Sequence, residues 1–194
     1  AWHLKDNPDY DPNDPTVGLV HRIDKDTSGL LVVAKNADAK THLGKQFFNK
    51  TTKRLYNALV WGNFQEEEGR IEGNIARHPK DRMQMAVFPP DSEIGKHAVT
   101  HWRVIERLGY VTVIECSLET GRTHQIRVHL AYIGHPILGD TVYGAKKPVP
   151  GLTGQCLHAT GLQFLHPSTG EKITLTCPLP EEFTKMLKKL QSQR

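Results

Sequence analysis

The chain has 194 residues, of which 38% are hydrophobic and 24% are charged, and its net charge is +4. This length suits one well-buried domain, and the composition is that of a globular protein rather than a disordered one. The longest apolar run, residues 29–34, is far shorter than the roughly 18 residues of a membrane span, so we expect no membrane partner. The three cysteines include no C-x-x-C pair, which favours a reducing cytoplasm and argues against a zinc site.

The first part of the chain is predicted to be irregular and then to enter a strand and a helix. Residues 1–17 are rich in Asp, Asn and Pro, which indicates an exposed segment. The apolar run 30–35, LLVVAK, is typical of a buried strand. The helix that follows is capped by Asn36 or Asp38 and ends near Asn49, because its apolar residues recur at four-residue spacing.

The middle of the chain is predicted to consist of strands. Residues 53–61 and 70–76 alternate as strands do, and a polar segment, 77–87, follows them. Residues 98–108 and 110–119 are rich in β-branched residues and flank a central glycine, which predicts a hairpin.

The last part of the chain mixes helices and strands. Residues 123–134 switch to helical spacing and end at a glycine suited to a helix C-terminus. Residues 156–166 and 171–177 are predicted strands, and 181–191 form an amphipathic helix with acids first and lysines last. The whole pattern predicts an α+β domain dominated by strands.

A polar stretch, HRIDKDTSG, lies directly before the apolar run 30–35. Residues 26–29 are good turn formers whose side chains bond their own backbone, so we interpret them as a turn. Asp24 precedes this turn, and in an extended stretch its side chain points to the same face as that of Arg22. A nearby arginine favours the ionised carboxylate that nucleophilic attack on carbon requires. By this reasoning alone, Asp24 is equally consistent with a structural salt bridge.

Two further segments offer candidate binding groups. The sequence ETGRTHQIRVH places a Gly-Arg-Thr turn before a helix, whose free N-terminal N–H groups suit a phosphate. Arg127 borders the apolar stripe of that helix, so its head can reach a cleft, although a surface arginine fits the pattern as well. In the strand 53–61, Tyr56 shares a face with Arg54. It is either a core residue or a platform on which an unstacked base stacks.

Taken together, these segments resemble the RluA/RluD-type RNA pseudouridine synthases. The resemblance rests on HRIDKDTSG, a K-R-x-Y strand, RHP-x(2)-R-x(2)-MAV, and GRTHQIRVH followed by GHPILGD and a late LHA. It implies a mixed, mainly antiparallel sheet flanked by a few helices, within a catalytic domain over residues 18–194. The family's first strand and an S4-type RNA-binding domain have no counterpart here, so we expect a C-terminal fragment.

The resemblance also implies an activity and the residues that perform it. The activity is isomerisation of uridine to pseudouridine in RNA, with large-subunit (23S) ribosomal RNA preferred over transfer RNA, by a cytoplasmic monomer without metal or cofactor. Asp24 matches the essential aspartate, and Arg22 matches the arginine that replaces the extruded uridine in the stack. Tyr56 matches the tyrosine that stacks on the target base, and Arg127 matches the basic residue that pairs with the carboxylate. Asp24 then acts as a nucleophile at C1′ or as a base that begins elimination to a glycal.

Two other functions fit parts of the pattern. A glycoside or N-glycosidase hydrolase would use Asp24 and Asp26 as a carboxylate pair. Acids two residues apart in a turn rarely reach the required separation of about 5 Å or more across a substrate. The other alternative is an RNA-binding module that has no catalytic activity.

Overall fold

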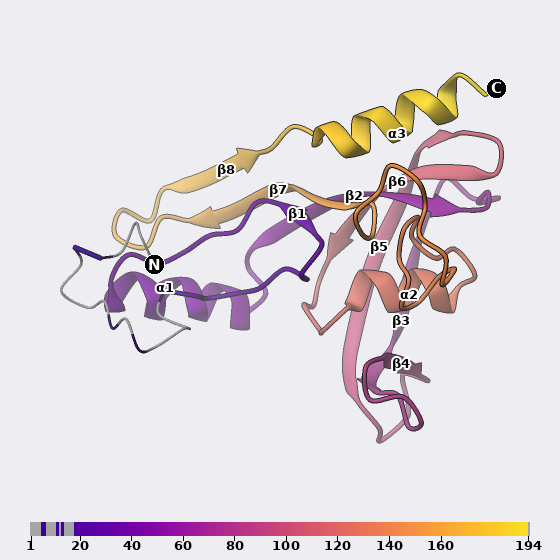
Figure 1. Cartoon of the computed structure of the whole chain (residues 1–194). Helices are drawn as coiled ribbons and strands as arrows, with labels where there is room; N and C mark the ends of the chain where they lie inside the picture. Colours follow the sequence, from indigo (N-terminus) through magenta and orange to yellow (C-terminus); the bar gives the residue numbers. More distant parts are fainter. Residues whose placement is uncertain (1–4, 7–10, 12, 14–17, 194) are drawn as a thin grey trace.

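The computed structural model describes residues 5–6, 11, 13 and 18–193. The exposed segment predicted for residues 1–17 therefore falls almost entirely outside the described residues and stays a prediction. Within the described residues, eight strands form one sheet and three helices pack against it (Figure 1). None of these helices has the length and apolarity needed to cross a bilayer.

The sheet is mixed, and nearly all of its strand pairs are antiparallel. Its order is β1-β7-β2-β6-β5-β3-β4, and β8 pairs with the same edge of β7 as β1 does. The strands are β1 (Ser28–Gly29), β2 (Lys53–Trp61), β3 (Glu68–Arg77), β4 (Met85–Phe88), β5 (Lys96–Arg107), β6 (Val111–Leu118), β7 (Leu157–Leu165) and β8 (Lys172–Thr176). Among these described strands only β1 and β7 pair in parallel. The predicted α+β fold with a mixed, mainly antiparallel sheet is confirmed.

β2 crosses the middle of the sheet, with β6 on one side and β7 on the other. Its central residues Ala58, Leu59 and Val60 are completely buried, which means that both faces of the sheet are covered there. The hairpin of β5 and β6 turns at Gly109, whose φ of +79° is a conformation that residues with a Cβ rarely adopt. The predicted strand at 53–61 and the predicted hairpin are therefore confirmed.

Three helices cover the sheet: α1 (Ala37–Phe48), α2 (Gln125–Tyr132) and α3 (Glu181–Gln191). In the view of Figure 1, α1 and α2 lie below the sheet and α3 lies above it. The predicted cap Asn36 begins α1, because its Oδ1 accepts the Ala39 N–H at 2.8 Å. The three predicted helices are confirmed.

The described residues form three core clusters, one large and two smaller. In the large cluster, Leu130 of α2 and Phe183 of α3 pack with residues of β2 and β6. In the second cluster Leu43 of α1 packs with Leu162 of β7, and in the third Val128 of α2 packs with residues of β3 and β5. Because α1 and α2 belong to different clusters, the sheet between them is left open to a cavity.

Residues 30–35 are not the buried strand that their apolar run predicts. This stretch of chain joins the sheet only as the short strand β1 (Ser28–Gly29), because β8 occupies the same edge of β7 from Gly161 onward. Leu31 and Val33 are consequently exposed. Hydropathy identifies the apolar side chains but does not show which segment of the chain pairs with the edge strand of a sheet.

The strand β4 begins in the segment 77–87, which is predicted to be polar, and ends at Phe88. Its four residues are apolar and half-buried and pair with β3, but the polar residues before them hide this short strand in the sequence. Its Met85 N–H donates to the Tyr143 hydroxyl at 2.8 Å. This bond ties the edge of the sheet to the loop that follows α2.

Candidate active site

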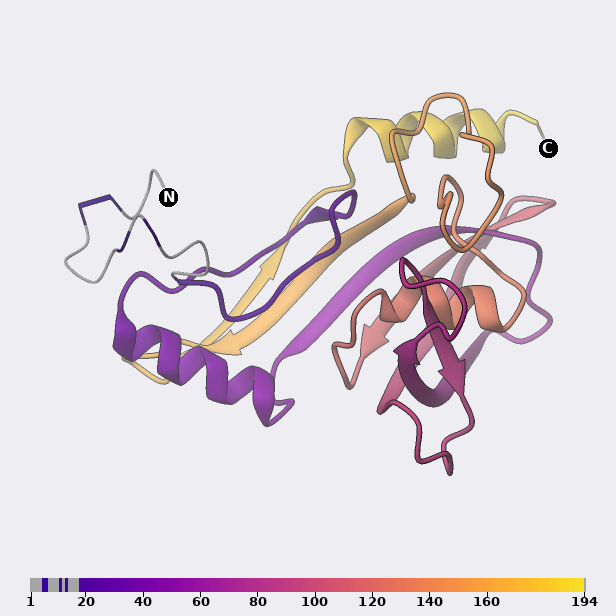
Figure 2. The ribbon, with the colours of Figure 1, turned by 60° about the horizontal axis from the view of Figure 1, so that its bottom comes forward.

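A cavity of about 460 Å³ opens between the C-terminal end of α1 and the N-terminal end of α2. Figure 2 shows β2 running between these two helices. Three stretches of chain supply its lining, from residues 20–27, 47–56 and 118–126, with Leu157 of β7 completing it. Residues that are far apart in sequence therefore line one half-open cavity.

The Asp24 carboxylate and the Arg127 guanidinium meet at the wall of this cavity. Arg127 Nη1 donates to Asp24 Oδ2 over 3.4 Å. The same guanidinium makes two shorter bonds to Asp140, from Nε at 2.7 Å and from Nη2 at 3.1 Å. The side chains of Asp140 and Arg127 are 1% and 8% exposed, whereas that of Asp24 is 15% exposed. Asp140 thus holds the arginine in place and leaves one of its edges to Asp24.

Arg127 keeps its charge although it is buried. Burial alone would lower the pKa of its guanidinium, but the hydrogen bonds and charge of Asp140, together with those of Asp24, raise it instead. Its Cζ lies 5.2 Å from the centroid of the Tyr143 ring, a cation–π contact. The Tyr143 hydroxyl lies 2.8 Å from His124 Nδ1, which helps to fix that ring. The interpretation of Arg127 as a surface arginine is therefore wrong.

Hydrogen bonds to the region of β7 hold the stretch that carries Asp24. The Thr27 N–H donates to Asp24 O at 3.1 Å, so the turn spans residues 24–27 rather than the predicted 26–29. Gln155 Nε2 donates to the Thr27 hydroxyl at 3.1 Å. Ser28 Oγ lies 2.7 Å from His158 Nδ1. The turn formers of HRIDKDTSG thus fix the backbone behind the carboxylate.

Tyr56 and Arg54 line the cavity from the same face of β2, as the alternation of the strand predicts. Tyr56 is 7% exposed. Burial raises the pKa of its hydroxyl, the charge of Arg54 opposes this rise and the charge of Asp24 adds to it, so the phenol is neutral at neutral pH. The buried Arg54 lies against Gly121, where an added Cβ would collide with its guanidinium. Among the described residues, Arg54 Nε has no hydrogen-bond partner, which leaves a donor beside the cavity.

His21, the first residue of HRIDKDTSG, connects that stretch to α1. Its ring stacks on Phe47 with centroids 4.4 Å apart, and its Nε2 accepts the Val32 N–H at 3.0 Å. Burial and the charge of Arg54 lower the pKa of His21 to about 4. The ring is therefore neutral at physiological pH and serves as packing rather than as a proton donor.

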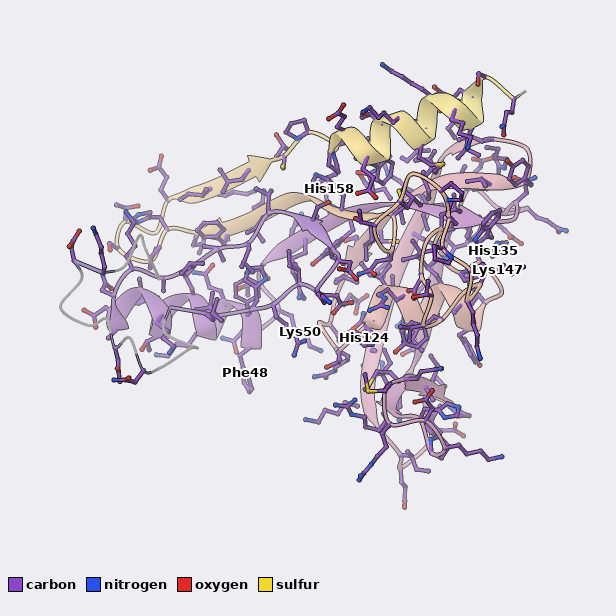
Figure 3. The ribbon with its side chains drawn as sticks, in the orientation of Figure 1. Phe48, Lys50, His124, His135, Lys147 and His158 are labelled. Carbon is purple, nitrogen blue, oxygen red and sulfur yellow. The ribbon has the colours of Figure 1, made fainter. Side chains whose placement is uncertain are left out.

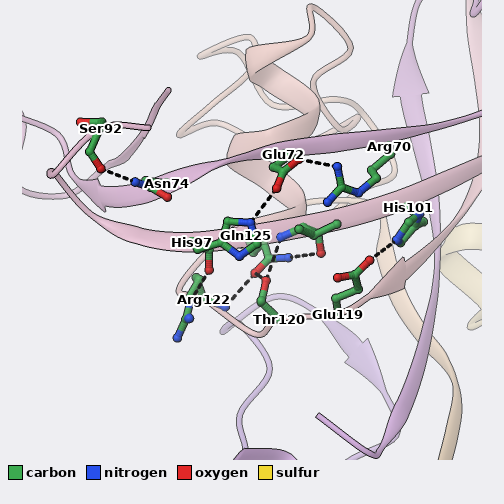
Figure 4. Close-up of polar contacts among 11 residues, drawn as sticks. Arg70, Glu72, Asn74, Ser92, His97, His101, Glu119, Thr120, Arg122 and Gln125 are labelled. Carbon is green, nitrogen blue, oxygen red and sulfur yellow. Dashed lines mark hydrogen bonds and ion pairs between the residues drawn. The ribbon is translucent and has the colours of Figure 1, made fainter. Parts of the chain in front are cut away.

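Gln125 anchors the N-terminal end of α2 (Figure 4). Its Oε1 accepts the Thr120 hydroxyl at 2.7 Å and the Arg122 N–H at 2.9 Å. Its Nε2 donates to Val99 O and to Thr100 Oγ1, both at 3.0 Å. The Arg122 N–H, part of the turn predicted to bind phosphate, is therefore already occupied by a side chain.

Sequence reasoning placed three cavity residues but missed the group that organises them. Arg22, Asp24 and Tyr56 all line the cavity, and Arg127 contacts Asp24 directly. Asp140 stands in the sequence analysis only as the last residue of the GHPILGD motif, with no chemical role assigned to it. A buried charge requires a partner, but the sequence alone does not show that Asp140 is buried. Within the described part of the chain, no three His, Cys, Asp or Glu side chains are grouped as metal ligands.

Comparison with known proteins identifies the family of this chain. A family model described as RNA pseudouridylate synthase matches residues 3–132. The chain belongs to this family. The finding confirms the family resemblance that the motifs of the sequence carry.

Curated relatives of the family are similar over nearly the whole chain. The chain is 50% identical to the uncharacterised RNA pseudouridine synthase YlyB of Bacillus subtilis, covering 90% of this chain and 56% of the relative. It is 46% identical to ribosomal large subunit pseudouridine synthase D of Nitrosomonas europaea, covering 92% of this chain and 52% of that protein. The chain thus spans little more than half the length of these relatives.

Two solved human structures share the fold of this pseudouridylate synthase family member. Human RNA pseudouridylate synthase domain containing 1 is 27% identical with a TM-score of 0.70, covering 89% of this chain and 79% of that one. Human RNA pseudouridylate synthase domain containing 4 is 26% identical with a TM-score of 0.73, and the coverage is 89% and 75%. Both likenesses extend over most of the chain.

Proposed function

We propose that residues 18–194 form the catalytic domain of an RNA pseudouridine synthase that isomerises uridines in large-subunit ribosomal RNA. The observation that carries this proposal is the contact of Asp24 with Arg127 at the wall of a half-open cavity, in a chain of this family. The choice of RNA is supported by relatives that are named as large-subunit enzymes.

The target uridine has to leave its helix before it reaches such a cavity. Extrusion of a base from a stacked helix costs a few kcal/mol. Arg22 lines the cavity, is exposed and carries a planar cation, which suits it to replace the extruded base in the stack. Tyr56 offers an aromatic ring to the extruded base.

Asp24 is the proposed reacting group. In the isomerisation the N1–C1′ bond breaks, the base turns, C5 bonds to C1′, and the proton on C5 is released. Asp24 either attacks C1′ or removes the proton that begins elimination to a glycal, and both routes need an ionised carboxylate. Arg127 places a fixed positive charge beside the Asp24 carboxylate, at 3.4 Å. The reaction is redox-neutral, so the proposal requires no metal or organic cofactor.

The activity is tested with RNA that carries tritium at C5 of uridine. Pseudouridine formation releases this tritium, whereas a glycosidase would release free uracil. We expect tritium release without free uracil, and the reverse result would contradict the proposal. Mapping pseudouridines in large-subunit ribosomal RNA from cells that lack the gene would then test the choice of RNA. The same map of transfer RNA serves as the comparison.

The extrusion role of Arg22 has its own test. Arg22→Ala should slow turnover on a stem-loop target more than on a single-stranded target, because only the stem requires a base to be replaced. Lys25→Ala, which removes a nearby exposed cation, is the matched control and should affect both targets equally. Equal losses on both targets for Arg22→Ala would remove Arg22 from this role.

We also propose that the protein acts in the cytoplasm and as a monomer. The three cysteines are unpaired, as is usual in a reducing compartment. Sedimentation of the purified protein tests the monomeric state.

A further inference from the structure

The cavity continues past the proposed target site to an exposed aromatic ring. Phe48, the last residue of α1, lines the cavity and is 86% exposed, more than any other large apolar residue in the described part of the chain. Its neighbour Phe47 is engaged by the His21 ring and by the Arg54 guanidinium. Phe48 has no ring partner among the described residues. Exposed single apolar residues are common, so the exposure of Phe48 alone does not indicate a binding site.

A second observation concerns Lys50, two residues further along, whose backbone has a conformation that favours glycine. The Thr51 N–H donates to Gln46 O and the Lys50 N–H donates to Phe47 O, at 3.0 and 3.3 Å. This is a Schellman helix end, whose left-handed position is usually glycine. Lys50 occupies that position with φ +59°, and its side chain lines the cavity next to Phe48. A lysine at this position carries backbone strain that a glycine would avoid, which favours a functional use of its charge.

The charges around the cavity suit a nucleic acid backbone. Four lining residues are cationic (Arg22, Lys50, Arg54 and Arg122) and two are acidic (Asp24 and Glu119). Glu119 is already bonded to His101 Nε2 at 2.6 Å. Figure 3 shows Phe48 and Lys50 at the end of α1 nearest α2, with His124 of the opposite wall across from them. Phe48 and Lys50 are thus both exposed, and both line a cavity with more cationic than acidic residues.

We propose that Phe48 and Lys50 form a second subsite, which binds the nucleotide adjacent to the extruded uridine. The adjacent base stacks on the Phe48 ring, and its phosphate contacts the Lys50 ammonium. This inference rests on the proposed function, because it takes the neighbouring part of the cavity as the site of the target base. Stacking on an aromatic side chain tolerates any base, so the subsite contributes affinity rather than sequence preference.

The stacking part is tested by binding to a single-stranded RNA nonamer with a central uridine and 2-aminopurine beside it. Phe48→Ala should weaken binding by roughly 5- to 100-fold, the effect of losing one base–aromatic stack. It should also abolish the quenching of the 2-aminopurine, whereas Phe48→Trp should retain both. Ile105→Ala removes a half-exposed apolar residue outside the cavity and should change neither.

A second nonamer, abasic on both sides of the uridine, separates stacking from general damage. On this RNA, Phe48→Ala should bind as the parent does, because there is no adjacent base to stack. An equal loss of affinity on both nonamers, or no loss on either, would overturn the subsite.

The phosphate part is tested with Lys50→Gly. Glycine adopts this backbone conformation without strain, so the substitution removes the ammonium group and preserves the helix end. The slope of log Kd against log salt concentration should fall by about 0.7, the value for one phosphate contact on a single strand. Lys45→Ala, which removes an exposed lysine of α1 outside the cavity, should leave the slope unchanged. Equal slopes for Lys50→Gly and the parent would overturn this contact.

These titrations are independent of turnover. Binding that depends on Phe48 without any tritium release would contradict the proposed function and leave the subsite standing. Tritium release together with binding that is unchanged in Phe48→Ala would support the proposed function and overturn the subsite. Absence of any binding to the nonamer would overturn the subsite directly.

Discussion

Arg127 lies between two carboxylates that differ in burial and in distance. Asp140 is the closer and more buried of the two, and it also accepts the Val142 and Tyr143 N–H groups at 2.9 and 3.1 Å. Asp24 makes one longer contact and faces the cavity. The pair of Asp140 with Arg127 is therefore structural, and Asp24 is the carboxylate left available for chemistry.

Removing these two carboxylates should have very different effects on stability. Asp140→Ala leaves a buried guanidinium with one long contact, and breaking such a buried pair costs about 3–5 kcal/mol of unfolding free energy. Asp24→Ala should cost less than about 1 kcal/mol, because its contact is long and partly exposed. Urea denaturation of both variants measures the difference. Equal costs would show that Arg127 depends on both acids alike.

At the scale of elements, α2 is docked on β5 by polar side chains as well as by its apolar stripe. His129 is fully buried, and its Nδ1 lies 2.9 Å from Thr100 Oγ1. Burial lowers the pKa of His129 to about 4.

The buried histidine predicts a loss of stability in acid. In the unfolded chain a histidine titrates near pH 6.5, so between about pH 6.5 and 4 the unfolded state binds the extra proton. The free energy of unfolding therefore falls as the pH drops through this window, by about 3 kcal/mol for this one residue. His129→Gln should flatten the dependence on pH, as measured by urea denaturation at several pH values. His42→Gln, at an exposed position of α1, should not, and identical slopes in the two variants would contradict the argument.

The elements that could be predicted are those with a local signal. α1 has a capping residue, Asn36, and the β5–β6 hairpin has a glycine at its turn. The predictions for residues 30–35 and for β4 were wrong because pairing at a sheet edge depends on which other strand lies there. β8 occupies the edge of β7 beside residues 30–35, and β4 pairs with β3 although its residues are only half-buried.

The site could be predicted only in part for the same reason. Asp24 and Tyr56 stand in motifs whose order is recognisable along the chain. Asp140 is 13 positions from Arg127, in another element, and no periodicity relates the two. Phe48 and Lys50 lie at the end of α1, and only the fold shows that this end borders the cavity.

At the scale of the whole molecule, the cavity depends on helices held at opposite ends of one sheet. α3 has no residue in the cavity, but it packs Phe183, Met186 and Leu190 onto the large core cluster. It therefore acts as a support for the sheet that carries β2. The two ends of α1 and α2 that face the cavity depend on this rigid platform.

Substitution of two helical phenylalanines should distinguish a residue that stabilises the fold, Phe183, from one that binds RNA, Phe48. Phe183→Ala empties a buried site and should cost about 3–5 kcal/mol of unfolding free energy. Phe48→Ala removes an exposed ring and should change stability by less than about 0.5 kcal/mol. Thermal and urea denaturation measure both effects. A large loss for Phe48→Ala would mean that its ring is part of the core.

The central claim is that Asp24 is the reacting carboxylate, and Asp24→Asn tests it most directly. The amide keeps the size of the side chain and can still accept a hydrogen bond from Arg127, but it carries no charge. The measurement is tritium release from C5-tritiated uridine RNA, with binding of the same RNA measured in parallel and Asp26→Asn as the control. We predict that release falls to background in Asp24→Asn, that its binding stays within about twofold of the parent (well under 1.4 kcal/mol), and that Asp26→Asn retains turnover. Turnover by Asp24→Asn comparable to the parent would contradict the account.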